Sequence, residues 1–364
     1  MSSYSRRDIL KYGAIGAAGL ASLSALGACG DDSDEPTATL DPNDLEPFEA
    51  KDSAGRATGL PARIAWASTA DSEFFLALGR GMEQAAKDRD IDYLTATSGN
   101  DPAKHVDQMN GFLDRGVGAM AMQPLNADAD SLVLQRAIDK GVCAQGIITA
   151  PSTMQVVASQ YQIGFDQGKA AADYVKTNLG GNAQAIYFNL DTAAEQLKIR
   201  HRGVLDGLKT GGEGIEVVAD LTVAEISTSS GFNTMMSALQ TNSDIKVVLG
   251  GDTIVVGAFK ALKESGKLTD DMFLSGVDGD REALELIKAG GAYKLSIAFA
   301  WSLMGYGLGQ YGADWIEGND VPRMIQAKGV SLDSAASVTK FEAASADPAS
   351  VFKDRQAYED YLPL

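Results

Sequence analysis

Residues 63–97 read RIAWASTADSEFFLALGRGMEQAAKDRDIDYLTAT, and they contain a complete strand–helix–strand pattern. The two ends, Ile64–Ser68 and Ile91–Thr97, are short runs of apolar and β-branched side chains that predict strands. Between them, Leu78 and Met82 recur at helical spacing, which predicts an amphipathic helix. Strands joined by a crossover of this length lie parallel in one sheet, so the stretch predicts an α/β fold.

The same alternation of strands and helices continues along the chain. It supplies more strands than one sheet of this kind holds, so we predict two doubly wound parallel-sheet lobes, each Rossmann-like. The N-terminal lobe is expected at 61–160 together with about 300–322, and the C-terminal lobe at 161–299 together with about 323–364. Further strands are predicted at 117–123, 142–148, 183–189, 215–220, 245–250, 272–277 and 294–298.

Residues 1–28 have the composition of an export signal. Adjacent Arg6 and Arg7 resemble a twin-arginine signal, and the uncharged run at 12–28 is too short and too weakly apolar for a good membrane span. The last four residues up to Cys29, Leu-Gly-Ala-Cys, resemble a bacterial lipobox. This resemblance implies cleavage before Cys29 and lipidation of its sulfur; the alternative is a plain secretory signal with a chance cysteine.

The next segment, 29–60, is rich in Asp, Glu and Pro and has almost no large apolar side chains. Such a segment cannot bury enough surface to offset the entropy of ordering, so we predict a disordered acidic tether. Together with the lipidated cysteine, it would hold an exported protein on the outer face of the cell membrane, or in a periplasm.

Composition excludes several classes of function. The chain has 31 basic and 49 acidic residues, a net charge of −18, which disfavours a nucleic-acid partner. Lipidation of Cys29 would leave Cys143 alone in an apolar run, where a small core residue is expected and no intrachain disulfide can form. The two histidines, His105 and His201, stand apart, so no metal cluster and no cofactor are predicted.

The candidate ligand site follows from the predicted fold. In doubly wound sheets, ligands bind beyond the carboxyl ends of the strands. The segments after the strands mix aromatic, amide and carboxylate side chains, which suits a sugar, because hydroxyls need donors and acceptors while ring faces need aromatic walls. These segments are 68–75, 123–126, 148–149, 189–191, 250–252, 277–279 and 299–301.

Over residues 61–325 the chain resembles the ribose-binding-protein branch of the type I periplasmic binding proteins. The order and spacing of several short motifs carry the resemblance. They are Phe74-Phe75, Asn100-Asp101-Pro102, Gln123-Pro124, Arg200-His201-Arg202-Gly203, Gly251-Asp252-Thr253 and Gly276-Val277-Asp278-Gly279.

The resemblance implies a non-enzymatic solute-binding protein of an ABC importer that captures a monosaccharide, deoxysugar or polyol. In this family, paired aromatics form a wall of the sugar site, an Arg at a helix start binds the ligand, and an Asp in the Gly-x-Asp-Gly turn accepts from hydroxyls. The ligand-binding residues implied here are Ser72, Phe74, Phe75, Gln123, Thr149, Arg202, Asp252, Asp278 and Phe299.

Several positions depart from the family pattern. Ile148-Thr149 stands where the family has Asp-Arg, Gly251 where it has Asn, Phe299 where it has Gln, and Ser72 where it has Asn. We therefore expect a more apolar pocket with fewer polar contacts, which favours a polyol or deoxysugar over ribose. Each site residue also has a structural alternative, such as a surface role for Arg202 or a helix N-cap role for Asp252.

Three chain crossings, expected near Gln160, Phe299 and Pro322, would allow the lobes to close around the ligand as a monomer. The closed form would then be recognised by a membrane permease. A ligand sensor that presents a sugar-like signal to a membrane receptor is the alternative. A repressor core and a carbohydrate-active enzyme using Asp252 and Asp278 are weaker alternatives.

Overall fold

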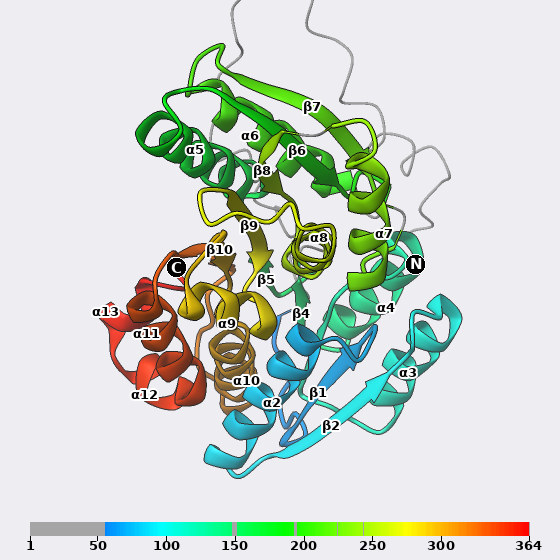
Figure 1. The fold of residues 1–364 in the computed structure, drawn as a ribbon. Helices are drawn as coiled ribbons and strands as arrows, with labels where there is room; N and C mark the ends of the chain where they lie inside the picture. The colour runs from blue at the N-terminus through cyan, green and yellow to red at the C-terminus, as the bar shows by residue number, and fades with distance from the viewer. Residues whose placement is uncertain (1–54, 148–150, 193–194, 224, 243, 364) are drawn as a thin grey trace, which may run out of the picture. The chain divides into compact units, whose positions relative to one another are not determined.

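Two six-stranded sheets form the framework of the protein (Figure 1). The computed structural model describes residues 55–147, 151–192, 195–223, 225–242 and 244–363, and all of them fall in a single structural unit. The strands of the first sheet are β1 (Arg63–Ser68), β2 (Asp92–Thr97), β3 (Ala119–Met122), β4 (Cys143–Ile147), β5 (Met154–Val157) and β11 (Met324–Gln326). The strands of the second sheet are β6 (Ala183–Asn189), β7 (Ile215–Thr222), β8 (Ile245–Leu249), β9 (Phe273–Asp278), β10 (Tyr293–Ala298) and β12 (Val330–Leu332).

Both sheets have the doubly wound order. The first runs β11-β5-β4-β3-β1-β2 and is parallel throughout, while the second runs β12-β10-β9-β8-β6-β7 with only β12 antiparallel. The central strands β3 and β4 are buried along their whole length, as expected where helices cover both faces of a parallel sheet. The predicted fold of two α/β lobes is therefore confirmed.

Helices separate the strands along the chain. Asp101 caps one of them by accepting a hydrogen bond from the Lys104 amide (3.0 Å), with Pro102 in the first turn, as the sequence predicts. The helices are α2 (Glu73–Asp88), α3 (Pro102–Asp114), α4 (Ala127–Asp139), α5 (Gln160–Asn178), α6 (Glu195–Lys209), α7 (Thr228–Ala238), α8 (Asp252–Glu264), α9 (Arg281–Ala289), α10 (Trp301–Glu317), α11 (Ala335–Ala346), α12 (Pro348–Lys353) and α13 (Arg355–Glu359).

Helices α2 and α10 pack unusually close together because glycines face each other. A Cβ atom on Gly81 would lie 2.1 Å from the Ser302 carbonyl oxygen, and one on Gly305 would lie 2.0 Å from that of Leu78. Both distances are shorter than any real contact, so only glycine permits this approach. The start of α10 is thereby held against α2, and both helices carry residues of the candidate site.

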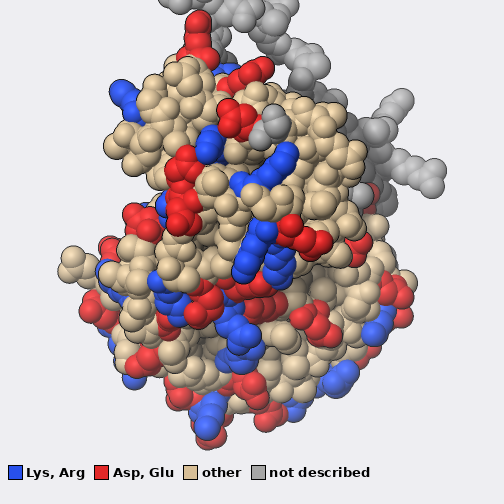
Figure 2. Space-filling model, in the orientation of Figure 1, with Lys and Arg blue, Asp and Glu red and all other residues tan. Residues whose placement is uncertain are grey.

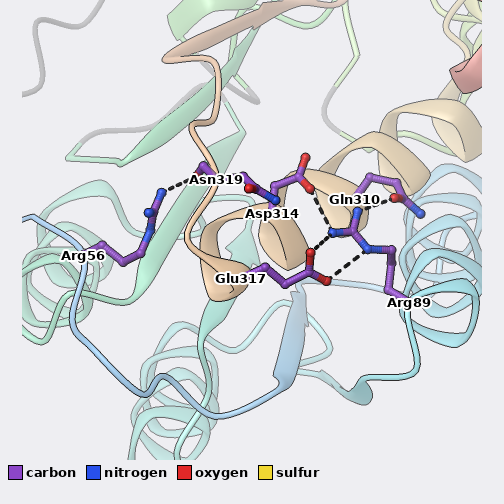
Figure 3. A network of polar contacts seen from close by, with 6 residues as sticks. All are labelled: Arg56, Arg89, Gln310, Asp314, Glu317 and Asn319. Carbon is purple, nitrogen blue, oxygen red and sulfur yellow. Dashed lines mark hydrogen bonds and ion pairs between the residues drawn. The ribbon is translucent and has the colours of Figure 1, made fainter.

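Arg89 fastens the other end of the same helix pair (Figure 3). Its guanidinium donates to Gln310 (2.9 Å), Asp314 (2.9 Å) and Glu317 (2.6 Å), which all lie on α10. Beyond the end of α10, the Arg56 side chain donates to the Asn319 carbonyl oxygen. The acceptors of Arg89, namely Gln310, Asp314 and Glu317, are three or four residues apart and therefore lie on one face of α10.

The chain passes between the two sheets three times. The passages lie between β5 and α5, between β10 and α10, and between β11 and β12 at 327–329. The third passage is therefore several residues beyond Pro322, near which the sequence placed it. The C-terminal segment contributes to both lobes. In the first lobe, β11 joins the sheet and α12 packs on α10. In the second lobe, α11 packs on α9 and β12.

Several expectations concern residues outside the described ranges. They include the export signal, Cys29, most of the tether and Thr149. None of the helices in the described ranges combines the length and the apolar character that a membrane span requires. Cys143 is fully buried in β4, and burial raises the pKa of its thiol to about 12, which confirms a core role.

Candidate functional site

Phe74 belongs to the lobe of the first sheet and Asp278 to the lobe of the second, and both line one cavity of about 470 Å³. Phe74 is in the first turn of α2, directly after β1, and Asp278 is the last residue of β9. Phe299 and Trp301, from the passage between β10 and α10, line the same space. Parallel strands bring their carboxyl ends to one edge, which is why residues so distant in sequence meet here.

Aromatic rings form one wall of this cavity. The ring of Trp301 lies 5.1 Å from Phe74 and 4.9 Å from Phe299, measured between centroids. The ring of Phe75 lies behind that of Phe74, with 3.8 Å between their centroids; it is 6 % exposed and packs on Trp66 at 6.2 Å. Phe74 therefore lines the cavity, while Phe75 supports it from the core.

The carboxylate of Asp278 accepts no hydrogen bond from any described residue. Its backbone is held instead, since the Trp301 indole Nε1 donates to the Asp278 carbonyl oxygen (3.1 Å), and its φ of 110° is followed by Gly279 at 80°. Burial raises the pKa of the Asp278 carboxyl, and the nearby Arg200 charge opposes that rise. A largely buried carboxylate with unused acceptor positions is suited to receive hydroxyl groups.

Asp252 has a different role from the one expected. It is fully buried, and its carboxylate accepts four hydrogen bonds, from the amides of Gly279 (2.8 Å) and Asp280 (2.9 Å) and the hydroxyls of Ser296 (2.6 Å) and Tyr293 (2.7 Å). The side chain has no exposed surface and does not line the cavity. Asp252 therefore supports the turn that carries Asp278.

Two further carboxyl groups of this region have raised pKa values. Burial raises the pKa of Asp252 to about 7, although its four hydrogen bonds oppose the change. Burial also raises the pKa of Asp280 to about 6, and the charges of Asp278 and Glu73 add to the rise. Perturbed carboxyl groups gathered at one cavity are typical of a functional site.

Arg202 does not join the other predicted residues. It is exposed, and its guanidinium lies 6.0 Å from the ring of Tyr161. Arg200 is near enough for its charge to oppose the rise in the pKa of Asp278 that burial causes, and it borders a small neighbouring cavity with Tyr187 and Gly250. Residues two apart on a helix point to nearly opposite sides, so only one of the two arginines could face inward.

Ser72 and Gln123 lie at the carboxyl ends of the first sheet. Ser72 precedes α2, and its hydroxyl is buried without a hydrogen-bond partner among the described residues. Gln123 follows β3 and is partly exposed, and its backbone carbonyl oxygen lies 3.2 Å from Nε2 of His105. Neither residue lines the cavity of Phe74 and Asp278, and no described contact involves the Gln123 side chain.

Arg200 and Trp301 were not among the individual residues expected to bind the ligand, although Trp301 lies in the expected segment 299–301. The helical spacing of Arg200 and Arg202 shows that only one of them can point toward the interior. Which one does so depends on the packing of α6 against α5, which the sequence does not show. Trp301 carried a weaker signal, namely its place directly after a strand.

Within the ranges that the structure describes, no group of three or more His, Cys, Asp or Glu side chains is placed to hold a metal ion. On the face drawn in Figure 2, acidic and basic side chains are interspersed, and no continuous basic area is visible there.

Known proteins match this chain over most of its length. Residues 64–319 match the family model described as periplasmic binding protein domain. A putative rhizopine-binding protein of Rhizobium meliloti is 28 % identical over 253 residues, which are 67 % of this chain and 80 % of that protein. The ribose import binding protein of Bacillus subtilis is 26 % identical over 273 residues, 71 % of this chain and 83 % of that protein.

A solved structure shares the fold. The ABC transporter solute-binding protein of Bacillus halodurans, determined with bound myo-inositol, superimposes with a TM-score of 0.66 at 22 % identity. The match covers 80 % of this chain and 99 % of that one.

Proposed function

Because the chain belongs to the periplasmic binding protein domain family, we propose that it is the extracytoplasmic solute-binding component of an ABC importer for a sugar or polyol. The family consists of binding proteins, so membership confirms the expectation that the chain is not an enzyme. Two relatives are named for binding rhizopine and ribose, and a structural neighbour holds myo-inositol. These ligands are small and rich in hydroxyl groups.

The observation that carries the proposal is the cavity shared by Phe74 and Asp278. An aromatic wall covers the apolar C–H face of a sugar ring, and a carboxylate without protein donors accepts from its hydroxyls. Arg200, whose charge acts on Asp278, would supply donors, since among the described residues only its Nε atom is engaged, with Gln160 (2.9 Å). The three groups together match the two kinds of surface that a sugar presents.

Capture would proceed by hinge closure about the three passages between the sheets. Closure removes the ligand hydroxyls from water, so each must find a partner or cost binding energy. The closed form would then be recognised by the permease. The aromatic Phe299 in place of an amide favours a ligand with fewer hydroxyls to satisfy, such as a polyol or deoxysugar.

A ligand panel tests the proposal. We would measure melting temperatures with D-ribose, D-allose, L-fucose, glycerol and myo-inositol, because a ligand that binds only the folded state raises the melting temperature. Isothermal titration calorimetry would then give dissociation constants for the wild type and for Asp278→Asn. We expect at least one compound to bind, and the variant to bind it at least tenfold more weakly, about 1.4 kcal/mol. A panel without any shift would refute the assignment.

We also propose that Cys29 anchors the protein to the membrane. The lipobox-like sequence before it supports this assignment. In cells, Cys29→Ser should move the exported protein from the membrane fraction to the soluble fraction. Equal membrane retention of both forms would contradict lipidation.

A further inference from the structure

His201 lies between two carboxylates on the second lobe. Its Nδ1 atom is 2.9 Å from Oδ2 of Asp191, which follows β6, and its Nε2 atom is 2.7 Å from Oδ2 of Asp220 on β7. The histidine side chain is only 17 % exposed. The first turns of α6 are thus joined through one ring to two neighbouring strands.

Both contacts require a proton on the nitrogen that faces the carboxylate. A neutral imidazole has one N–H, so it can donate to one carboxylate while its lone pair faces the other. The imidazolium form donates to both, and each bond is then strengthened by charge. The arrangement is therefore complete only when His201 is protonated.

Apart from His201, one described side chain donates a hydrogen bond to these two carboxylates. Asn189 donates to Oδ1 of Asp220 (2.6 Å), but Oδ1 of Asp191 is buried and has no partner among the described residues. The other titratable or charged groups that face the ring are Tyr187, whose ring lies 5.0 Å away on β6, and Arg200 on α6 itself. A neutral His201 would leave two carboxylates with one N–H between them.

Arg200 is the neighbour that this change would affect. It is adjacent to His201 on α6, and of its nitrogen atoms only Nε is bonded in the described structure. Asp191 and Arg200 both act electrostatically on Tyr187, so a released Asp191 carboxylate would attract the Arg200 guanidinium and compete with the ligand for it. Protonated His201 removes that competition by holding Asp191 in place.

We propose that His201 is a positioning residue, which in its protonated form restrains Asp191 and Asp220 and keeps Arg200 available to the ligand, so that affinity falls as pH rises. The inference rests on the proposed function, because it concerns the same site. It differs from that function in its readout, which is a pH dependence and not binding as such.

Two variants separate the charge of His201 from its shape. His201→Gln cannot become a cation, whereas His201→Lys stays a cation throughout the range in which histidine titrates. Dissociation constants for myo-inositol and D-ribose would be measured by calorimetry at about pH 5.5 and about pH 8.5, on either side of that range. Melting temperatures at both pH values confirm that each variant is folded.

We expect His201→Gln to bind about tenfold more weakly than wild type at the lower pH and equally at the higher, the effect of one charge-assisted hydrogen bond. His201→Lys should match wild type at the lower pH and exceed it at the higher. Asp252 and Asp280 also titrate in this range, but their effect is common to all three proteins and cancels in the ratios.

Ratios that stay the same at both pH values would overturn the positioning role while leaving the proposed function intact. A wild type that binds neither sugar nor polyol would refute the proposed function and this inference with it. The ring can also be observed directly by nitrogen NMR, since the chain has only one other histidine. Ring signals of His201 that do not change between the two pH values would equally contradict the proposal.

Discussion

Asp252→Ala is expected to destabilise the protein by about 4 kcal/mol. The carboxylate accepts hydrogen bonds from the amides of Gly279 and Asp280 and from the hydroxyls of Ser296 and Tyr293. Removing it leaves four donors without a partner, and each unsatisfied buried donor costs about 1 kcal/mol or more. The cavity left by the side chain adds to this cost.

Asp252→Asn is the matched control. Its amide oxygen can accept from the amides of Gly279 and Asp280 and from the hydroxyl of Ser296. Its amino group can donate to the Tyr293 oxygen, which can also accept. We therefore expect a loss of only about 1 kcal/mol, the cost of one altered hydrogen bond. The contrast between the variants isolates the hydrogen bonds from the shape of the side chain.

The asparagine variant should also change the pH dependence of stability. Burial raises the pKa of Asp252 to about 7 in the folded state, while an unfolded aspartate titrates near 3.9. The favourable contribution of this group is therefore fully present below about pH 4 and is lost as the pH rises through about 7. Wild type should lose stability over this window more steeply than Asp252→Asn.

Urea denaturation followed by tryptophan fluorescence measures these differences in the free energy of unfolding. The ligand dissociation constant of folded Asp252→Asn should stay within about threefold of wild type, since the side chain is fully buried and does not line the cavity. An alanine variant within about 1 kcal/mol of wild type would refute the reasoning. So would an asparagine variant that folds normally but loses ligand binding, because Asp252 would then contact the ligand.

Three further predictions follow from the geometry. Arg200→Ala should weaken ligand binding at least tenfold by calorimetry, while Arg202→Ala, at an exposed position, should change the dissociation constant less than about twofold. The reverse order would contradict the proposed site. Gly305→Ala should destabilise the fold by about 3 kcal/mol or more through overpacking, whereas Gly111→Ala, which meets only an ordinary contact on α3, should stabilise it by about 0.5 kcal/mol. Arg89→Ala should lower the free energy of unfolding by about 1–2 kcal/mol through its lost bonds to α10, and an unchanged urea midpoint would show that these bonds are replaced by water.

The pattern of strands and helices was predictable because each long element carries its own periodic signal. The strand expected at 183–189 is found there, and the strand expected at 64–68 begins one residue earlier. The strands β5, β11 and β12 were missed, since three or four residues show no measurable alternation. These short strands flank two of the three passages, so the third passage was placed too early.

The candidate site was predictable as a set of loops but not as a set of contacts. Asp278 and Phe74 were found because they follow strands, and the carboxyl ends of parallel strands meet. Asp252 occupies the same kind of position, yet its four hydrogen-bond donors come from segments 27 to 44 residues away. A local pattern cannot distinguish such a support residue from one that faces a ligand.

Local order in the chain was enough to establish two α/β lobes, their crossover connections and the edge at which a ligand would bind, because apolar spacing and strand ends are properties of short segments. The division of labour among the polar residues came only from the folded molecule. Whether Arg200 or Arg202 turns inward, and whether a carboxylate is already filled with donors, depends on neighbours that are brought together by packing between distant segments.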